Sequence, residues 1–155
     1  MEERHIRTSA KALVIRNGRM LAVKVRDEFG AFYILPGGGQ MPGETLPAAV
    51  EREVAEETGL RVRAEKLVFA VEGAEGEPDH RIDLVFLCRL FPEKANEDRV
   101  NDRNQIGIEW LPLETLNREP LYPSRLRRAV MNLWQGIETP VYLGNENMGD
   151  PEITE

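Results

Sequence analysis

Three glutamates in one short segment are the residues of this chain best suited to chemistry. Glu53, Glu56 and Glu57 stand at positions i, i+3 and i+4, so on an α-helix they project from one side. Like charges at this spacing destabilise a helix by about 0.2–0.5 kcal/mol per pair. Such a group is either a solvated acidic helix face or a cation site. Carboxylates are hard oxygen ligands that suit Mg²⁺, or alternatively Mn²⁺, better than zinc.

A divalent cation at this position would support hydrolysis of a phosphate anhydride. Magnesium polarises a phosphoryl oxygen, offsets charge on the leaving group and lowers the pKa of a bound water. A carboxylate could then take a proton from the water that attacks a pyrophosphate linkage. The chain has two histidines and one cysteine, so it lacks a well-spaced ligand set for a structural metal.

The sequence around the glutamates predicts a glycine-rich turn followed by a helix. Gly37, Gly38 and Gly39 permit positive φ angles and close approach of the backbone to a ligand. Thr45 is a favourable N-cap residue, and Gly59 suits the left-handed position after a helix. The apolar residues of this helix recur every four positions and predict a stripe that packs inward: Leu46, Val50 and Val54. The glutamates would then lie at the rim of the core, half sheltered from water.

This segment resembles the Nudix box, G-x5-E-x7-R-E-U-x-E-E-x-G-U, in which U is aliphatic. All nine specified positions are present between Gly38 and Leu60. The resemblance implies an α/β fold, a Nudix-like α/β/α sandwich with a mixed central sheet. It also implies an enzyme, a pyrophosphohydrolase that cleaves a nucleoside diphosphate linked to another moiety.

The resemblance further implies that Glu53, Glu56 and Glu57 bind the metal ions. It leaves the general base open, because the choice varies among relatives. Glu53 or Glu56 could serve, or an acid from the charged loop 93–102, which is equally consistent with a plain solvated loop. The candidates in that loop are Glu97, Asp98 and Asp102.

Roles for the other residues of the box follow from their positions. Arg52 stands four residues before Glu56, so we expect it to orient that carboxylate rather than touch substrate. The carbonyl of Gly37 or Gly38 would complete the metal shell. Glu44 either fixes the junction between the glycine turn and the helix or binds a further ion.

Outside the box the candidates for substrate binding are basic residues at strand ends. Lys24 and Arg26 could contact phosphates or simply be solvated, and His80 and Arg81 could contact phosphate or base or simply begin a strand. Glu72 is a candidate additional metal ligand. Three aromatic residues are placed where a base could stack, but they suit a core strand equally well: Phe29, Phe32 and Tyr33.

Strand-like and helical segments alternate along the chain. Strands are predicted over residues 6–16, 19–26, 32–35, 62–72, 81–91 and 106–111, and a second helix over 122–135. Asn17-Gly18 predicts a hairpin between the first two strands. Ser124 is the expected N-cap of the second helix, and its inward residues are expected to be Leu126, Val130, Leu133 and Trp134. Trp110 and Cys88 are expected in the core.

Composition and charge narrow the class of protein. With 155 residues and 41% apolar content, we expect one Nudix domain over residues 1–136, followed by an acidic tail or strap over 137–155. A net charge of −7 argues against a DNA partner and suits a site whose cations arrive as metal ions. The small nucleotide substrate is what the resemblance implies. The single cysteine fits a reducing cytoplasm, and neither a signal peptide nor a membrane-spanning run is visible. Homodimers are common in the family that this sequence resembles, so the resemblance implies a possible homodimer here.

Several functions share this box, and no residue of the sequence decides among their substrates. A hydrolase of ADP-ribose or a nucleotide sugar is favoured over one of oxidised nucleoside triphosphates. A non-catalytic nucleotide sensor is disfavoured because such modules lose glutamates of the box, and all are present here. An isomerase acting on an isoprenoid diphosphate would need a reactive cysteine, for which Cys88 in an apolar run is a poor candidate. A purely structural protein would need neither the glycines nor the clustered glutamates.

Overall fold

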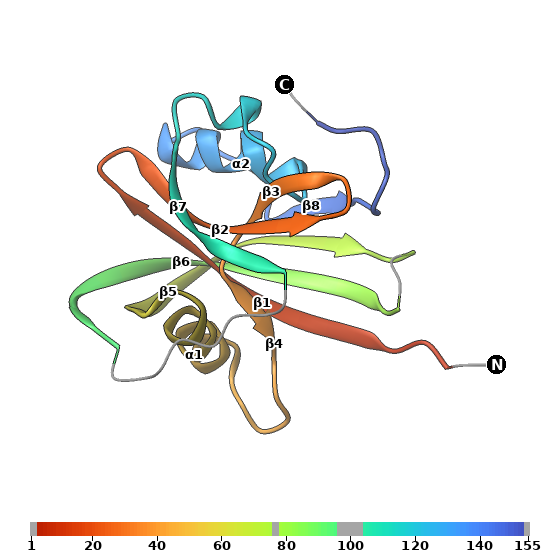
Figure 1. The fold of residues 1–155 in the computed structure, drawn as a ribbon, viewed down its shortest axis with the longest axis horizontal. Coiled ribbons are helices and arrows are strands. Elements are labelled where there is room, and N and C mark those ends of the chain that lie inside the picture. The colour runs from red at the N-terminus through yellow and green to blue at the C-terminus, as the bar shows by residue number, and fades with distance from the viewer. Residues whose placement is uncertain (1–2, 76–77, 96–103, 154–155) are drawn as a thin grey trace.

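A mixed β-sheet runs through the molecule with one helix on each side of it (Figure 1). The computed structural model describes residues 3–75, 78–95 and 104–153. Its elements are, in chain order, β1 (Ile6–Arg16), β2 (Arg19–Asp27), β3 (Gly30–Ile34), β4 (Gly37–Gly39), α1 (Leu46–Thr58), β5 (Leu60–Gly73), β6 (His80–Lys94), β7 (Gln105–Pro112), the short 3₁₀ helix η1 (Leu116–Arg118), α2 (Arg125–Trp134) and β8 (Tyr142–Asn145). The predicted α/β/α fold is confirmed.

The strand order of the sheet is β3-β2-β1-β6-β5-β8, with β4 paired to β1 and β7 paired to β2. β1 with β6 and β5 with β8 are parallel pairs, and the other pairs are antiparallel. β1 pairs with β2 only near the hairpin, at Ile15 and Arg16. The preceding part of β1 lies between β4 and β6. This long strand therefore carries the glycine strand β4 on one edge.

The hairpin predicted from Asn17-Gly18 is present. Both residues have positive φ, 53° and 73°, which is the conformation that a tight two-residue hairpin needs. The predicted bounds of the first strand match β1, whereas β5 and β6 are longer than predicted at both ends. Bulges in β5 at three places let this strand curve while it stays paired with β6.

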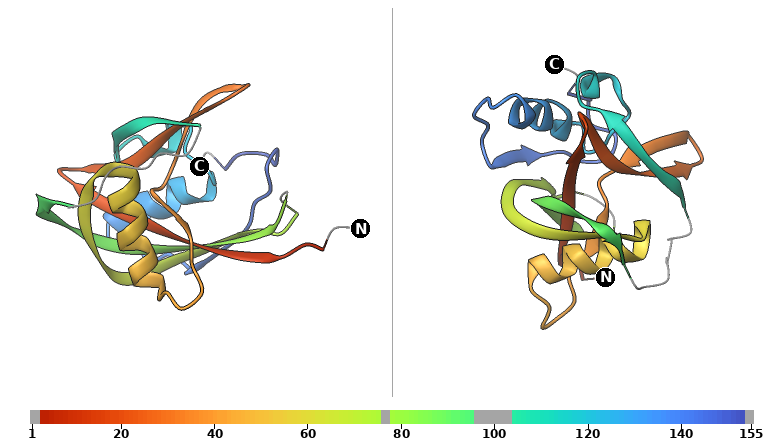
Figure 2. Two further views of the ribbon diagram at one scale, coloured as in Figure 1. Left: turned by 60° about the horizontal axis from the view of Figure 1, so that its bottom comes forward. Right: turned by 90° about the vertical axis from the view of Figure 1, so that its left-hand side faces the viewer.

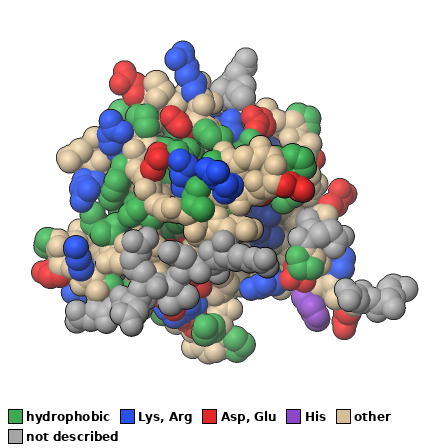
Figure 3. Space-filling model, in the orientation of Figure 1, with side chains coloured by type: hydrophobic (Ala, Val, Ile, Leu, Met, Phe, Trp, Pro, Cys, Tyr) green, Lys and Arg blue, Asp and Glu red, His purple; other side chains and the backbone are tan. Residues whose placement is uncertain are grey.

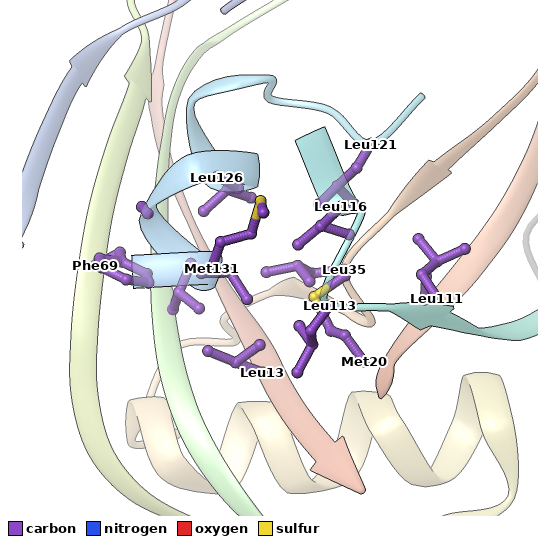
Figure 4. Packing of buried hydrophobic residues seen from close by; sticks show 14 of the residues in the cluster. Leu13, Met20, Leu35, Phe69, Leu111, Leu113, Leu116, Leu121, Leu126 and Met131 are labelled. Carbon is purple, nitrogen blue, oxygen red and sulfur yellow. The ribbon is translucent and has the colours of Figure 1, made fainter. Parts of the chain in front are cut away.

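Two hydrophobic clusters fill the two faces of the sheet because successive residues of β1 point to opposite faces. Ala10 and Val14 belong to the cluster beneath α1, together with Val50 and Val54. Leu13 belongs to the cluster beneath α2, which Figure 4 shows in close-up. The helices lie on opposite sides of the sheet in both views of Figure 2. The apolar stripe predicted for α1 is confirmed at its two valines.

The second helix differs from the prediction at both ends. It begins at Arg125, and Ser124 occupies the N-cap position without making a side-chain capping bond. Leu126 and Val130 are buried as predicted, but the prediction for Trp134 is wrong, because 42% of it is exposed. As the last residue of α2 it lies at the rim, 3.8 Å from where a Cβ atom on Gly18 would be, and so covers the hairpin turn.

Two further segments hold structure that the sequence did not indicate. The glycines expected as a turn form β4, and residues 142–145 of the expected tail form β8 against β5. Cys88 is buried as predicted, and burial raises the pKa of its thiol to about 12. Trp110 is half-buried beneath the guanidinium of Arg16. Among the described residues no helix is long and apolar enough to cross a membrane.

Candidate active site

The glycine strand β4 lies between β1 and α1, and its backbone groups point alternately toward and away from β1. The N–H of Ala12 donates to the carbonyl of Pro36 at 2.8 Å, so this carbonyl faces β1. Because neighbouring residues of an antiparallel strand face opposite ways, Gly37 and Gly39 present their N–H and C=O groups to the other edge. This edge pairs with no strand of the described residues. The carbonyl of Gly37, which the sequence nominated for a metal shell, therefore points toward α1.

A side chain at either of the first two positions of β4 would overlap a neighbouring group. Gly37 has a φ of 143°, and a Cβ atom there would lie 2.2 Å from the carbonyl oxygen of Ala10. A Cβ atom on Gly38 would lie 2.6 Å from the carboxyl carbon of Glu53. Glycine thus allows the backbone of β4 to rest against both β1 and the glutamates of α1.

Glu57 is the most buried of the three glutamates, with 5% of its surface exposed. Its Oε1 accepts a hydrogen bond from the N–H of Gly37 at 2.6 Å, and its Oε2 accepts one from Nε2 of Gln105 at 2.5 Å. Burial raises the pKa of Glu57 to about 7, although the bond from Gly37 and the positive charge of Lys11 oppose this shift. Burial thus outweighs these favourable contacts in setting the pKa of Glu57.

Arg52 joins the other carboxylates of the site into one network. Its Nε donates to Oε2 of Glu44 at 2.7 Å, and its Nη1 lies 3.0 Å from Oε1 of Glu53 and 3.3 Å from Oε2 of Glu56. Its Nη2 donates to the carbonyl of Gly39 at 3.1 Å. The hydrogen bond to Glu44 is the main cause that raises the pKa of Arg52. Arg52 thus contacts Glu56, as the sequence suggested, but its closest contact is with Glu44.

Glu44 also ties the loop before α1 to the helix. Its Oε1 accepts hydrogen bonds from the N–H of Met41 at 3.1 Å and from Nη2 of Arg52 at 3.0 Å. The bonds from Arg52 are the main cause that lowers the pKa of Glu44. Thr45 follows as the N-cap of α1 and accepts from the N–H of Ala48. These contacts match the first of the two roles considered for Glu44, the loop–helix junction.

Negative charge exceeds positive charge around this network. Among residues 3–75, 78–95 and 104–153, four carboxylates, those of Glu44, Glu53, Glu56 and Glu57, face the cations Arg52 and Lys11. Burial raises the pKa of Glu53, while the hydrogen bond from Arg52 opposes that shift. The excess of negative charge favours binding of a further cation.

The donor atoms fit a hard divalent metal ion, although they are not converged on one point. In the part of the chain that the structure describes, no three acidic, histidine or cysteine side chains are gathered tightly enough to hold an ion. The reason is that Glu53 and Glu56 turn to Arg52, and Glu57 turns to Gly37. All the donors are nevertheless oxygens, and the carboxyl group of Glu53 occupies the space that a side chain on Gly38 would fill. Metal binding would need the carboxylates to rotate within this space.

The basic residues predicted on β2 lie in a separate network. Lys24 Nζ is 3.8 Å from Oε1 of Glu109, whose Oε2 accepts from the hydroxyl of Tyr33 at 2.8 Å. Burial is the main cause that raises the pKa of Tyr33 to about 12. Arg26 is exposed at the end of β2. Within the described residues neither Lys24 nor Arg26 contacts a glutamate of α1.

The aromatic residues considered for base stacking are spread over different environments. Phe29 lies at the β2–β3 turn and is 90% exposed, so it does not belong to the core. Phe32 packs edge to face against Tyr122, with ring centroids 5.9 Å apart. Tyr33 is half-buried and packs against the cluster beneath α2.

Glu72 and His80 are held by each other rather than by the site. Oε2 of Glu72 lies 2.6 Å from Nε2 of His80, and its Oε1 accepts from the hydroxyl of Tyr142 at 2.9 Å. The bond with His80 is the main cause that lowers the pKa of Glu72. Arg81 pairs with the buried Asp83 through Nε and Oδ2 at 3.0 Å. Glu72 thus links β5, β6 and β8.

Sequence reasoning missed two residues beside Glu57. Lys11 interrupts the apolar side of β1, which is a signal that could have been noticed. Gln105 carried no signal, because it lies at the end of a charged segment and reaches Glu57 only through the fold. The alternative bases Glu97, Asp98 and Asp102 lie outside the described residues.

A hollow of about 650 Å³ lies on another side of α1. It is lined by residues of α1 and of the facing ends of β5 and β6: Ala48, Glu51, Arg52, Ala55, Arg61, Val62, Glu93, Lys94 and Ala95. Its lining includes Arg52 but none of the three glutamates at positions 53, 56 and 57. The three glutamates thus lie outside this hollow.

Comparison with known protein families matches residues 5–133 to the NUDIX domain. The chain is 31% identical over 124 residues to the nucleoside triphosphatase NudI of an Enterobacter species, covering 72% of this chain and 85% of the relative. It is also 31% identical over 127 residues to an ADP-ribose pyrophosphatase of Methanocaldococcus jannaschii, covering 79% and 75% of the two chains.

Solved structures resemble the fold at lower identity. A NUDIX hydrolase from Nitrosomonas europaea superposes with a TM-score of 0.70 at 17% identity, covering 88% of this chain and 94% of the other. An ADP-ribose pyrophosphatase from Streptococcus suis superposes with a TM-score of 0.64 at 20% identity, covering 88% and 97%. These likenesses bear on the fold alone.

Proposed function

Because this chain belongs to the Nudix hydrolase family, we propose that it uses Mg²⁺ to cleave the pyrophosphate linkage of a nucleoside diphosphate joined to another moiety. The observation that carries this proposal is the state of Glu57. The fold buries its carboxylate, fixes it on the backbone of the glycine strand and raises its pKa to about 7. A carboxylate held in this way is suited to a cation that arrives with the substrate.

Glu53, Glu56 and Glu57 would hold the metal, with the carbonyl of Gly37 as a backbone donor. When bound, Mg²⁺ would polarise the phosphoryl oxygen and lower the pKa of a water molecule. The side chains of the protein would position the metal-binding carboxylates. Arg52 contacts Glu53 and Glu56 in this structure. To bind the metal, these two carboxylates would rotate away from the guanidinium toward the open edge of β4.

The general base is proposed to be Glu53 or Glu56. Both carboxylates lie at the rim of α1, with 19% and 31% of their side chains exposed, so a water molecule can reach them. Glu57 is less suited because both its oxygens accept hydrogen bonds from Gly37 and Gln105. A base must lie within hydrogen-bond reach of the attacking water.

For the substrate we favour ADP-ribose or a nucleotide sugar. The supporting likeness is to the ADP-ribose pyrophosphatase of Methanocaldococcus jannaschii. The equal identity to the nucleoside triphosphatase NudI supports a nucleoside triphosphate, including an oxidised one, as the second candidate.

A phosphate-release screen with Mg²⁺ distinguishes these candidates. The panel is ADP-ribose, nucleoside diphosphate sugars, oxidised and normal deoxynucleoside triphosphates, and dinucleoside polyphosphates, each assayed with added phosphatase. We expect turnover of ADP-ribose or a sugar derivative that stops when EDTA is added. Hydrolysis confined to triphosphates would select the second candidate. Nucleotide binding with no hydrolysis of any compound would contradict the enzyme proposal and favour a nucleotide sensor.

A further inference from the structure

Two arginines lie side by side on the sheet next to the glycine strand. β1 and β6 run parallel, and their register places Arg7 beside Arg81, so both side chains project from the same face. Like charges on adjacent strands destabilise a sheet. In a protein with a net charge of −7, such a pair needs an explanation.

Only one of the two arginines is neutralised. Arg81 pairs with Asp83, which is 3% exposed and whose second oxygen, Oδ1, makes no hydrogen bond to any described residue. Arg7 is exposed and forms no ion pair or side-chain hydrogen bond within the described part of the chain. The buried Asp83 therefore fixes Arg81, while Arg7 is left to bind an anion.

The head of Arg7 lies against Gly39, at the end of β4. A Cβ atom on Gly39 would be 2.7 Å from Nη2 of Arg7, so the guanidinium occupies the space that a side chain at position 39 would fill. The preceding residue, Gly38, is the one against which Glu53 rests. Because successive strand residues point to opposite faces, the guanidinium of Arg7 and the carboxylate of Glu53 lie on opposite faces of β4, at adjacent residues. Figure 3 shows Lys and Arg side chains interspersed with acidic ones on the face that Figure 1 turns to the viewer.

We propose that Arg7 binds a phosphate of the substrate beside the scissile linkage, whereas the guanidinium of Arg81 is turned toward Gly73 of β5 and takes no part in this site. The proposal rests on the proposed function, because it places a diphosphate along the open edge of β4. The glutamates on one side of this strand would hold the metal-bound phosphate, and Arg7 on the other side would hold its neighbour. Guanidinium groups bind phosphate oxygens through paired, charge-assisted hydrogen bonds.

Gly39 offers a test that leaves Arg7 itself in place. Gly39→Ala adds a methyl group where the end of the flexible Arg7 side chain lies, and the φ of Gly39 is not positive, so the backbone accepts alanine. The test variants are Arg7→Gln and Gly39→Ala. The control is Arg16→Gln, which removes the same charge from the same strand at an arginine that stacks on Trp110. The probe is methylenediphosphonate with Mg²⁺, measured by isothermal titration calorimetry.

We expect the Kd for methylenediphosphonate to rise on the order of tenfold in Arg7→Gln and in Gly39→Ala, as for loss of one charge-assisted contact, and to stay unchanged in Arg16→Gln. With the substrate found in the screen, Arg7→Gln should raise KM and leave kcat nearly unchanged, as for a contact made equally in ground and transition states.

Three outcomes would overturn the assignment: a wild-type protein that does not bind the diphosphonate, an Arg7→Gln variant that binds it normally, or a Gly39→Ala variant that does so. Hydrolysis by the wild type with an unchanged KM in Arg7→Gln would remove Arg7 alone from the site. Binding that depends on Arg7, in a protein that hydrolyses nothing, would retain the phosphate site and remove the hydrolase proposal.

Discussion

Glu57 shows how one residue can be kept in an unfavourable state by its surroundings. Two donors, Gly37 and Gln105, hold its carboxylate inside the protein, yet burial outweighs them and raises its pKa to about 7. Its neighbour Glu53 is shifted in the same direction for the same reason. If a metal ion binds here as proposed, its binding at neutral pH would displace a proton from this site.

The raised pKa of Glu57 predicts how the stability of the metal-free protein depends on pH. The folded state binds a proton at Glu57 that the unfolded state releases above its ordinary pKa of 4.5, so this group lowers the free energy of unfolding as pH rises from 4.5 to about 7. The full effect is on the order of 3 kcal/mol. Glu57→Gln lacks it. Urea unfolding in EDTA should show the variant gaining stability relative to wild type between pH 5 and pH 8, and a constant difference would refute the assignment.

Arg52 is predicted to matter for stability as well as for activity. Its guanidinium contacts Glu44, Glu53 and Glu56, and removing it leaves these carboxylates to repel one another. Arg52→Met should lower the free energy of unfolding by about 2 kcal/mol at pH 7, measured by urea denaturation. Arg63→Met, at an exposed position on β5, is the control and should cost much less. Equal losses in the two variants would show that the network does not stabilise the fold.

At the scale of elements, the glycine strand β4 determines where the site can form. Gly37 lies against the backbone of β1, whereas Gly38 lies against the carboxylate of Glu53. The same substitution at these adjacent positions should therefore have different consequences. A methyl group on residue 37 would meet the backbone of β1, which cannot move aside. A methyl group on residue 38 would meet the end of the Glu53 side chain, which can.

Gly37→Ala should destabilise the protein strongly, because its methyl group would overlap the carbonyl of Ala10 and its φ of 143° strains any other residue. Gly38→Ala should keep the melting temperature within a few degrees and lower kcat/KM by about tenfold or more, since it displaces Glu53. Thermal unfolding and steady-state kinetics on the two variants test this. A Gly38→Ala enzyme with full activity would show that Glu53 needs no particular position.

Local sequence patterns predicted most elements but not this strand. Alternating and helical periodicity located β1, β2 and α1, and Asn17-Gly18 located the first hairpin. The glycines of β4 gave no strand signal, because glycine has low strand propensity and the pairing depends on β1, more than 25 residues earlier. The small strand β8 was missed for the same reason, since its partner β5 lies far away in sequence.

At the scale of the whole molecule, the C-terminal segment fastens α2 to the sheet. Glu146 follows β8 and accepts hydrogen bonds from the N–H groups of Ser124 and Arg125, at 2.7 and 3.0 Å. Its carboxylate thus caps the positive end of the helix, in place of the hydroxyl of Ser124. The hydroxyl of Tyr122 donates to Glu152 further along the same segment.

Glu146→Ala should therefore destabilise the folded protein by about 1–2 kcal/mol, as for loss of an N-cap. Its effect on kcat/KM should be small, because no contact joins Glu146 to the described glutamates of α1. Glu138→Ala, at an exposed position before β8, is the matched control. Thermal unfolding of both variants gives the comparison, and an unchanged melting temperature in Glu146→Ala would refute the capping role.

The candidate site was predictable in the part that is contiguous in sequence. The glycines, Glu44, Arg52 and the three glutamates lie within about two dozen residues. Arg52 and the three glutamates share one helix, and the glycines and Glu44 shortly precede it. Arg7, Lys11 and Gln105 come from β1 and β7, and their positions depend on strand pairing that no local pattern specifies. Lys24 was nominated from its strand end but is held by Glu109.

The measurement that tests the central claim most directly is the Mg²⁺ dependence of turnover in Glu57→Gln. Gln preserves the shape of the side chain and removes its charge, and the fold should be retained, as circular dichroism can verify. We predict that kcat on the best substrate of the screen falls by about two orders of magnitude or more, and that added Mg²⁺ does not restore it. Wild-type turnover in the variant at the same Mg²⁺ concentration would contradict the assignment of this glutamate to the metal site.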